Sequence, residues 1–160
     1  MLQLVTTLHQ LINNLEQLIK YAEQKKTVLI ERKVDDLNQL VKKEAKLVKL
    51  LDQLEQERIE LVERVMQEHP SISFSQFIEQ LPDETTKKNI QFQLKTLQQL
   101  MEELQAKNKV NERLLKDSMS FVQHMIDQVT KSKQQDFNYQ SPLGQQKSPT
   151  SGRGFFDTKA

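Results

Sequence analysis

The stretch "LNQLVKKEAKLVKLLDQLEQERIELVERV" (residues 37–65) repeats large apolar residues at alternating steps of three and four. Such steps place successive side chains on one face of an α-helix, which is typical of helices that pack against other helices. The stretch therefore predicts a long amphipathic helix. The repeat positions are Leu37, Leu40, Glu44, Leu47, Leu51, Leu54, Arg58, Leu61 and Val65. We interpret its two charged members, Glu44 and Arg58, as register-setting residues or as ends of buried ion pairs.

Two other segments carry the same repeat. The first segment has Leu4, Leu8, Leu11, Leu15, Leu18 and Ala22. The second has Ile90, Leu94, Leu97, Met101, Leu104, Asn108, Asn111, Leu115, Ser118, Val122, Met125 and Val129. Together the three repeats predict helices over about 2–31, 36–68 and 84–132. Short connections favour an antiparallel bundle or a long coiled-coil hairpin, so the predicted fold class is all-α.

Pro70 and Pro82 lie in the connection between the second and third long helices, and each favours a helix end or start. Between these prolines, Ser73 is a suitable N-cap for a short helical turn over 73–81, and Asp83 is a suitable N-cap for the next helix. The turn would cover the end of the bundle with Phe74, Phe77, Ile78 and Leu81.

The step of the repeat changes between residues 29 and 37, where the chain has neither glycine nor proline. This change indicates either a stutter within one continuous helix or a turn. We favour the turn, with Asp35 or Asp36 as the N-cap of the next helix.

The composition changes again near residue 134. All three glycines of the chain and two of its prolines lie between residues 142 and 154. Such a segment buries too little apolar surface to offset its conformational entropy, so we predict a helical domain of 1–133 and a flexible tail of 134–160. Within the tail, Phe155 and Phe156 are adjacent aromatics, which are either inert or form a short docking motif.

The composition of the 160 residues excludes several classes of protein. A formal net charge of +1 provides no general attraction for nucleic acid, and the absence of cysteine excludes disulfides. No apolar run reaches the roughly 18 residues of a membrane span. The start of the sequence also lacks the basic and apolar blocks of a signal peptide. We therefore expect a soluble cytoplasmic protein without membrane insertion.

The sequence has no arrangement of residues that is typical of a catalytic or metal site. His9, His69 and His124 lie in different segments, and no pair has metal-ligand spacing. The carboxylates lie beside lysines, as on solvated helix faces, and no glycine-rich loop is present to hold a phosphate. We predict that the protein is not an enzyme and has no metal or cofactor.

Asn108, Asn111 and Ser118 occupy repeat positions where apolar residues are expected. A buried leucine contributes roughly 1.5–3 kcal/mol, and an unpaired buried polar group costs about 1–3 kcal/mol. Two interpretations follow: the polar residues fix register, or this stretch is kept for a partner helix. The apolar residues of 108–129 cover about half of the helix circumference, more than a two-stranded seam needs, so a homodimer that hides them stays open as well. The candidate binding residues are Asn108, Asn111, Leu114, Leu115, Ser118, Val122, Met125, Ile126, Val129, Phe155 and Phe156.

The chain resembles the FlgN family of flagellar export chaperones. The similar features are "DDLNQLVKKEAKLVKLLDQLEQERIEL" (35–61), a connection containing Phe and Pro, and "NKVNERLL" (108–115). The ending "GRGFFDTKA" is similar to members from Gram-positive bacilli. One difference is Glu112, where the family tends to have a small residue.

The resemblance implies a cytosolic chaperone for the hook–filament junction (hook-associated) proteins of the bacterial flagellum. Such a chaperone binds the helical end of its client, prevents premature assembly and delivers the client to the export gate of the type III apparatus. The family's C-terminal region is the part credited with client binding. The alternative is a constitutive coiled-coil scaffold or adaptor with no client, in which the asparagines only set register. Hydrogen exchange separates the two, because a scaffold would be protected throughout and a chaperone poorly protected over 108–132.

Overall fold

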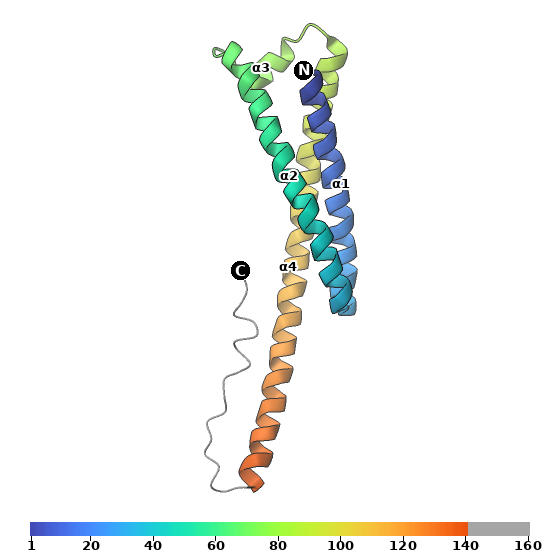
Figure 1. Ribbon diagram of the computed structural model, residues 1–160, viewed down its shortest axis with the longest axis vertical. Coiled ribbons are helices and arrows are strands. Elements are labelled where there is room, and N and C mark those ends of the chain that lie inside the picture. Colours follow the sequence, from blue (N-terminus) through green and yellow to red (C-terminus); the bar gives the residue numbers. More distant parts are fainter. Residues whose placement is uncertain (141–160) are drawn as a thin grey trace. The chain divides into compact units, whose positions relative to one another are not determined.

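The computed structural model describes residues 1–140, with side chains described up to residue 131. Every regular element in this part is an α-helix, which confirms the predicted fold class. The helices are α1 (Leu2–Glu31), α2 (Val34–Glu68), α3 (Phe74–Glu79) and α4 (Glu84–Gln140), shown in Figure 1. The chain divides into two compact units, Met1–Glu112 and the unit that begins at Arg113. The predicted docking motif at Phe155 and Phe156 lies outside the described residues.

A turn, and not a stutter, separates α1 from α2. Arg32 adopts the left-handed αL conformation (φ 57°, ψ 37°). Its backbone N–H donates to the Leu29 carbonyl at 3.3 Å, and the N–H of Lys33 donates to the Val28 carbonyl at 3.1 Å. These two bonds form a Schellman motif, which ends α1 by reversing the chain.

The predicted N-cap of α2 was wrong. Lys33 occupies the N-cap position without a side-chain cap, and Asp35 and Asp36 lie in the first turn of the helix. Because a single αL residue reverses the chain, α2 begins two residues earlier than the sequence suggested. Two carboxylates in the first turn still stabilise the helix through its dipole.

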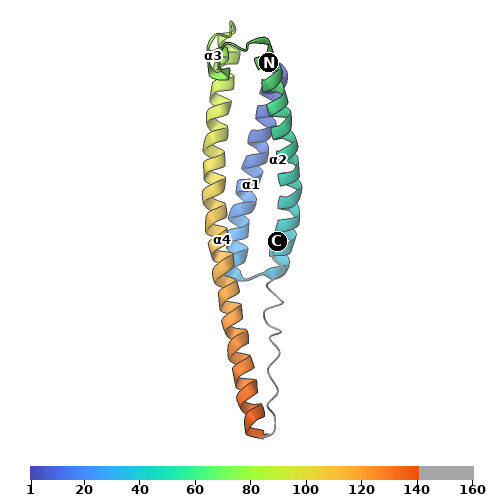
Figure 2. The same cartoon turned by 90° about the vertical axis from the view of Figure 1, so that its left-hand side faces the viewer.

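The caps of α3 and α4 were predicted correctly. The Ser73 hydroxyl accepts from the Gln76 N–H, and the Gln76 side chain accepts from the Ser73 N–H, which makes a capping box. Asp83 accepts from the Thr85 N–H at 3.1 Å and from the Thr86 hydroxyl at 2.5 Å, just before α4 begins. Figure 2 shows α3 at the end of the bundle, beside the N-terminus and the start of α4. Ile78 is buried there, so the short helix covers the core as expected.

The end of α4 lies beyond the predicted one. The helix continues to Gln140, whereas the sequence suggested an end near residue 132 and a tail from 134. No glycine or proline occurs between residues 84 and 140, and the next proline is Pro142. Since the residue before a proline disfavours the helical conformation, the local stop signal comes later than the change in composition suggested.

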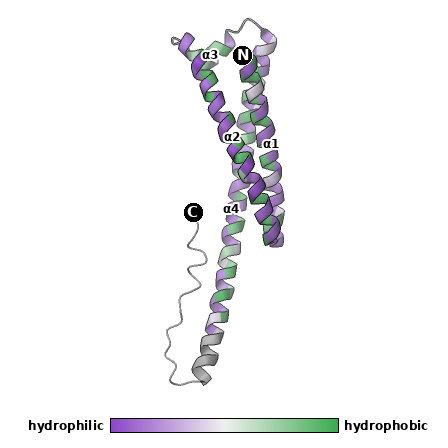
Figure 3. Ribbon diagram, viewed as in Figure 1, coloured by the Kyte–Doolittle hydropathy of each residue, from purple (hydrophilic) through white to green (hydrophobic). Residues whose placement is uncertain are grey.

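The core of unit Met1–Glu112 forms around α1. Figure 3 shows hydrophilic and hydrophobic residues alternating along α1 and α2, as expected of amphipathic helices. All six positions of the repeat from Leu4 to Ala22 are buried. Each buried leucine contributes roughly 1.5–3 kcal/mol, so this line is a main source of stability. The core cluster consists of Leu4, Leu8, Leu11, Leu15, Leu18, Leu54, Leu61, Ile78, Ile90 and Leu97.

Helix α4 keeps part of the predicted line, since Ile90, Leu97 and Asn111 are buried, but other positions of that line are not in the core. Met101 and Asn108 are exposed, so the prediction that Asn108 occupies a core position was wrong. Their neighbours Leu100 and Lys107 are half-buried instead, and Gln93 is buried. Gln93 donates to the Val5 carbonyl at 3.2 Å, and Lys107 pairs with Glu23 at 3.2 Å. The face of α4 that meets α1 is therefore rotated toward positions 93, 100 and 107.

Candidate functional site

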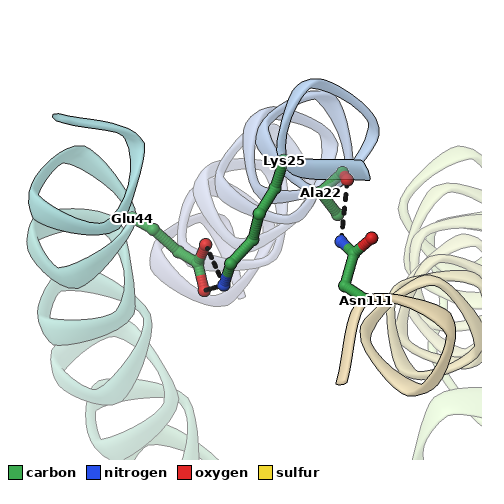
Figure 4. A network of polar contacts seen from close by, with 4 residues as sticks. All are labelled: Ala22, Lys25, Glu44 and Asn111. Atoms are coloured by element: carbon green, nitrogen blue, oxygen red, sulfur yellow. Dashed lines mark hydrogen bonds and ion pairs between the residues drawn. The ribbon is translucent and has the colours of Figure 1, made fainter. Parts of the chain in front are cut away.

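Asn111 is a buried polar residue at the contact between α4 and α1. Its side chain is 4% exposed, and its amide nitrogen donates to the Ala22 carbonyl at 2.8 Å (Figure 4). Its amide oxygen has no hydrogen-bond partner among the described residues. Because the Ala22 carbonyl is only an acceptor, it fixes the orientation of the amide. This geometry favours the interpretation that Asn111 sets the register of α4 on α1.

Two other buried amides repeat this arrangement. Asn14 donates to the Leu47 carbonyl of α2 at 3.0 Å, and Gln93 donates to the Val5 carbonyl of α1. In both, the amide oxygen lacks a partner among the described residues. The bonds from Gln93 to Val5 and from Asn111 to Ala22 also show that α1 and α4 run in the same direction, because residue numbers increase along both helices from the first bond to the second. Backbone carbonyls thus fix α1 in register with both neighbouring helices.

Glu44 and Arg58, the charged members of the 37–65 repeat, are ends of ion pairs. Glu44 pairs with Lys25 of α1 at 3.1 Å, close to the Asn111 bond (Figure 4). Arg58 pairs with Glu55 on its own helix, at 2.6 Å from Nη2 to Oε1. Hydrogen bonding to Arg58 lowers the pKa of the Glu55 carboxyl. Neither pair is fully buried, so the prediction of an ion pair is confirmed and that of full burial is not.

The two asparagines that the sequence placed in one site do not come together. Asn111 is engaged by α1 inside unit Met1–Glu112, whereas Asn108 is on the surface. Because Asn111 is buried and donates to Ala22 of its own chain, we leave it out of the proposed binding surface.

The remaining candidates lie in the unit that begins at Arg113. Leu114, Leu115, Ser118 and Ile126 are half-buried. Further along, Val122, Met125 and Val129 are 44%, 49% and 52% exposed. These three share one face of the helix because they are spaced by three and four residues. We call Val122, Met125 and Val129 the apolar line.

Phe121 is an exposed apolar residue of this unit that the candidate set omitted, although it lies within the predicted half-circumference. A large aromatic ring beside the apolar line is a usable sequence signal for a docking surface, because such rings bury much area in interfaces. The apolar line and Phe121 are thus exposed apolar residues on the same stretch of α4.

Other types of site have no support in the described part of the chain. No group of three or more His, Cys, Asp or Glu residues there is placed to hold a metal ion. None of the described helices has the length and apolarity needed to cross a membrane. The resolved pKa shifts belong to Lys33, Glu55, Arg58 and Asp83, and each arises from a hydrogen bond to a neighbour close in sequence. Structural ion pairs and caps also shift pKa values in this way.

A family model and a Bacillus protein each match most of the chain. The model of the family described as FlgN protein matches residues 1–147. A protein of Bacillus subtilis (strain 168), the uncharacterized protein YvyG, is 24% identical over 145 residues, which cover 91% of this chain and 89% of that protein. No solved structure matches the chain.

Proposed function

The chain belongs to the FlgN family of flagellar export chaperones, and from this premise we propose that it binds hook–filament junction (hook-associated) proteins through the second half of α4. The proposed surface consists of Leu114, Leu115, Ser118, Val122, Met125, Ile126 and Val129. Binding keeps the helical end of the client unassembled in the cytoplasm until the client reaches the flagellar type III export gate.

The observation that carries this proposal is the exposure of the apolar line. Val122, Met125 and Val129 are about half exposed on one face of a helix, and exposed apolar residues arranged in this way are typical of docking surfaces. A helix with apolar anchors at the same spacing would cover all three side chains. Met125 has an unbranched side chain, which adapts to different partners and suits a chaperone with more than one client.

In the free protein, the same residues offer a surface to a second copy, and a homodimer that dissociates on client binding is part of the proposal. The export gate would then receive the chaperone together with its client. Phe155 and Phe156 remain a sequence-based prediction of an additional docking motif.

The test is calorimetric titration of the full-length protein with a purified hook–filament junction protein. We expect saturable 1:1 binding, and we expect Val122→Asp to weaken it by about 2–4 kcal/mol, roughly 30- to 1,000-fold, because a carboxylate is then buried in an apolar contact.

Val110→Asp is the matched control. Val110 is 45% exposed on the same helix but lies before Arg113, so this substitution should leave the affinity within about twofold. Equal weakening by both substitutions, or none by Val122→Asp, would remove the apolar line from the binding surface.

The alternative of a constitutive scaffold is favoured by one observation, the bond between Asn111 and Ala22, which fits a purely register-setting role. Amide hydrogen exchange separates the two functions. A chaperone should exchange faster over 113–131 than over 90–111 when free, and slow down over 113–131 when its client is added. A scaffold would show equal protection over both stretches and no change on addition of the client.

A further inference from the structure

Unit Met1–Glu112 contains an open groove between α2 and α4. The groove has a volume of about 470 Å³. Leu11 and Leu15 of α1 form its floor, together with Leu97 of α4. The volume falls within the roughly 300–1,000 Å³ of typical binding pockets and allows several side chains of a partner to enter.

The groove arises from the way α4 presents its apolar residues. Positions 93, 100 and 107 face α1, which leaves Leu94 and Met101 on the adjacent line of the helix. Both line the groove, and Met101 is 52% exposed. Leu51 lines the opposite wall on α2. Two apolar walls thus face one another across the groove without closing it.

The dimensions fit a helix. Leu94 and Met101 are seven residues apart, as are Leu51 and Arg58 on the other wall. Seven helical residues span about 10 Å, so each wall is at least two turns long. A guest helix would place two or three anchors, at i, i+3 or i+4, and i+7, along this length.

The charge of the walls is acidic. Asp52 and Glu55 lie on the α2 wall and Glu102 on the α4 wall. Arg58 is the single cation among the lining residues. It donates to the Glu55 carboxylate from Nε at 2.8 Å and from Nη2 at 2.6 Å. Three carboxylates against one guanidinium leave the groove with two negative charges in a chain whose formal net charge is +1. A guest with basic residues beside its apolar stripe is complementary to these walls.

From this geometry we propose that the groove between α2 and α4 is a second docking site, which takes an amphipathic helix of a partner protein whose apolar stripe is flanked by Lys or Arg. The site lies within unit Met1–Glu112 and goes beyond the client surface proposed above. It does not depend on the identity of the client.

The first experiment uses two synthetic helical peptides as probes. Both have the same leucine stripe, which is flanked by lysines in one peptide and by glutamates in the other. Binding to the full-length protein carrying Val122→Asp is measured by fluorescence anisotropy, because that background weakens peptide contacts with the apolar line. The lysine peptide is expected to bind at least tenfold more tightly than the glutamate peptide. Equal affinity for both peptides would overturn the proposed charge complementarity.

Two groove variants locate the binding. Met101→Arg adds a charge at an exposed wall position and should weaken the lysine peptide at least tenfold. Asp52→Asn combined with Glu102→Gln keeps the size of both side chains, and should weaken the same peptide at least fivefold and reduce its salt dependence. If both variants bind the lysine peptide like their parent, the groove is not the site.

The control is Leu50→Arg, which alters an exposed apolar residue of α2 that lines a separate small pocket near Asn14. It should leave peptide binding within twofold. Sedimentation of the protein without peptide measures its oligomeric state, and so tests whether a second copy of the chain occupies the groove. A dimer that Met101→Arg converts to a monomer would assign the groove to a second copy of the chain and overturn the proposal of a partner helix.

Discussion

Single residues determine the register of the bundle. Asn14, Gln93 and Asn111 are buried amides that each donate to a backbone carbonyl of a neighbouring helix. In each residue the oxygen is left without a partner among the described residues, which costs about 1–3 kcal/mol for a buried acceptor. The net contribution of the bond that is made is only about 0.5–1.5 kcal/mol. The amides therefore specify alignment at little or no gain in stability.

Replacing Asn111 tests this balance. Asn111→Leu removes the bond to Ala22 but also removes the unbonded oxygen, so the free energy of unfolding should stay within about 1 kcal/mol of the parent or rise. Asn111→Asp directs a carboxylate at the Ala22 carbonyl and should lower the free energy of unfolding by about 3 kcal/mol at neutral pH. Urea unfolding monitored by circular dichroism measures both values.

The pH dependence of the Asn111→Asp variant provides the control. Burial raises the pKa of a carboxyl group, so the stability lost in Asn111→Asp should be recovered as the pH falls toward about 4, where the group becomes neutral. A loss of more than about 2 kcal/mol in Asn111→Leu would mean that the amide stabilises the fold as well as aligning it.

Asp83 gives a pH dependence of opposite sign. Hydrogen bonds from the Thr86 hydroxyl and the Thr85 N–H lower the pKa of the Asp83 carboxyl. A carboxyl whose pKa is lower in the folded state stabilises that state above its unfolded pKa, and this stabilisation is lost as the pH falls through the folded pKa. The melting temperature should therefore fall with acidification below about pH 4. In Asp83→Asn that decrease should be smaller, and an equal decrease in both proteins would show that the cap does not contribute to it.

At the scale of elements, the turn between α1 and α2 depends on one backbone conformation. Arg32 has φ 57°, which a β-branched residue adopts at a cost of about 1–2 kcal/mol and glycine adopts freely. We expect Arg32→Val to be less stable than Arg32→Gly by at least that amount in urea unfolding. Comparing two substitutions removes the contribution of the arginine side chain from the difference.

Lys33 supplies the matched control for this prediction. Its φ is −87°, in a region open to every residue. There the order should reverse, with Lys33→Gly less stable than Lys33→Val, because glycine loses more backbone entropy on folding. The same order at both positions would indicate that the αL conformation of Arg32 is not required for the turn.

The start of each element was predictable where local chemistry decides it. Ser73 and Asp83 cap α3 and α4 because their side chains bond N–H groups two or three residues away, and such spacing is visible in the sequence. The turn between α1 and α2 was predicted, but its αL residue was not, because arginine has no preference for positive φ that would distinguish Arg32 from its neighbours. Its conformation follows from the packing of α2 on α1.

Apolar spacing predicted only part of the face of α4 that meets the core: Ile90 and Leu97 are buried as expected, whereas Met101 and Asn108 are exposed. The sequence offers Leu94 and Met101 on one line and Gln93 and Lys107 on the next, and apolar spacing alone selects the first line. The structure turns the polar line toward α1 because Gln93 and Lys107 find partners there. The position of a backbone carbonyl acceptor cannot be inferred from a pattern of side chains. For the same reason, the sequence could not show that Asn111 bonds Ala22 of its own chain, and a partner helix remained an alternative.

At the scale of the whole molecule, the buried core cluster and the apolar line belong to different units. The buried leucines of the core cluster all precede residue 113, whereas the apolar line follows it. If burial stabilises the first unit and exposure serves binding in the second, the two properties should separate when α4 is shortened.

A chain that ends at Ser120 tests this separation. It keeps the half-buried residues from Leu114 to Met119 and lacks the apolar line. The free energy of unfolding in urea should change by less than about 1 kcal/mol, because the described residues that are lost are exposed, apart from the half-buried Gln123 and Ile126, and exposed residues contribute little to folding. Binding of a hook–filament junction protein should weaken at least about 100-fold, which corresponds to loss of an interface centre. Full-length Val122→Asp is the control that alters the surface without shortening the helix, and it should match the shortened chain in weak binding and the parent in stability. A shortened chain that unfolds much more easily would instead mean that the end of α4 is part of the folded core, and that its apolar residues are needed for stability and not for a client.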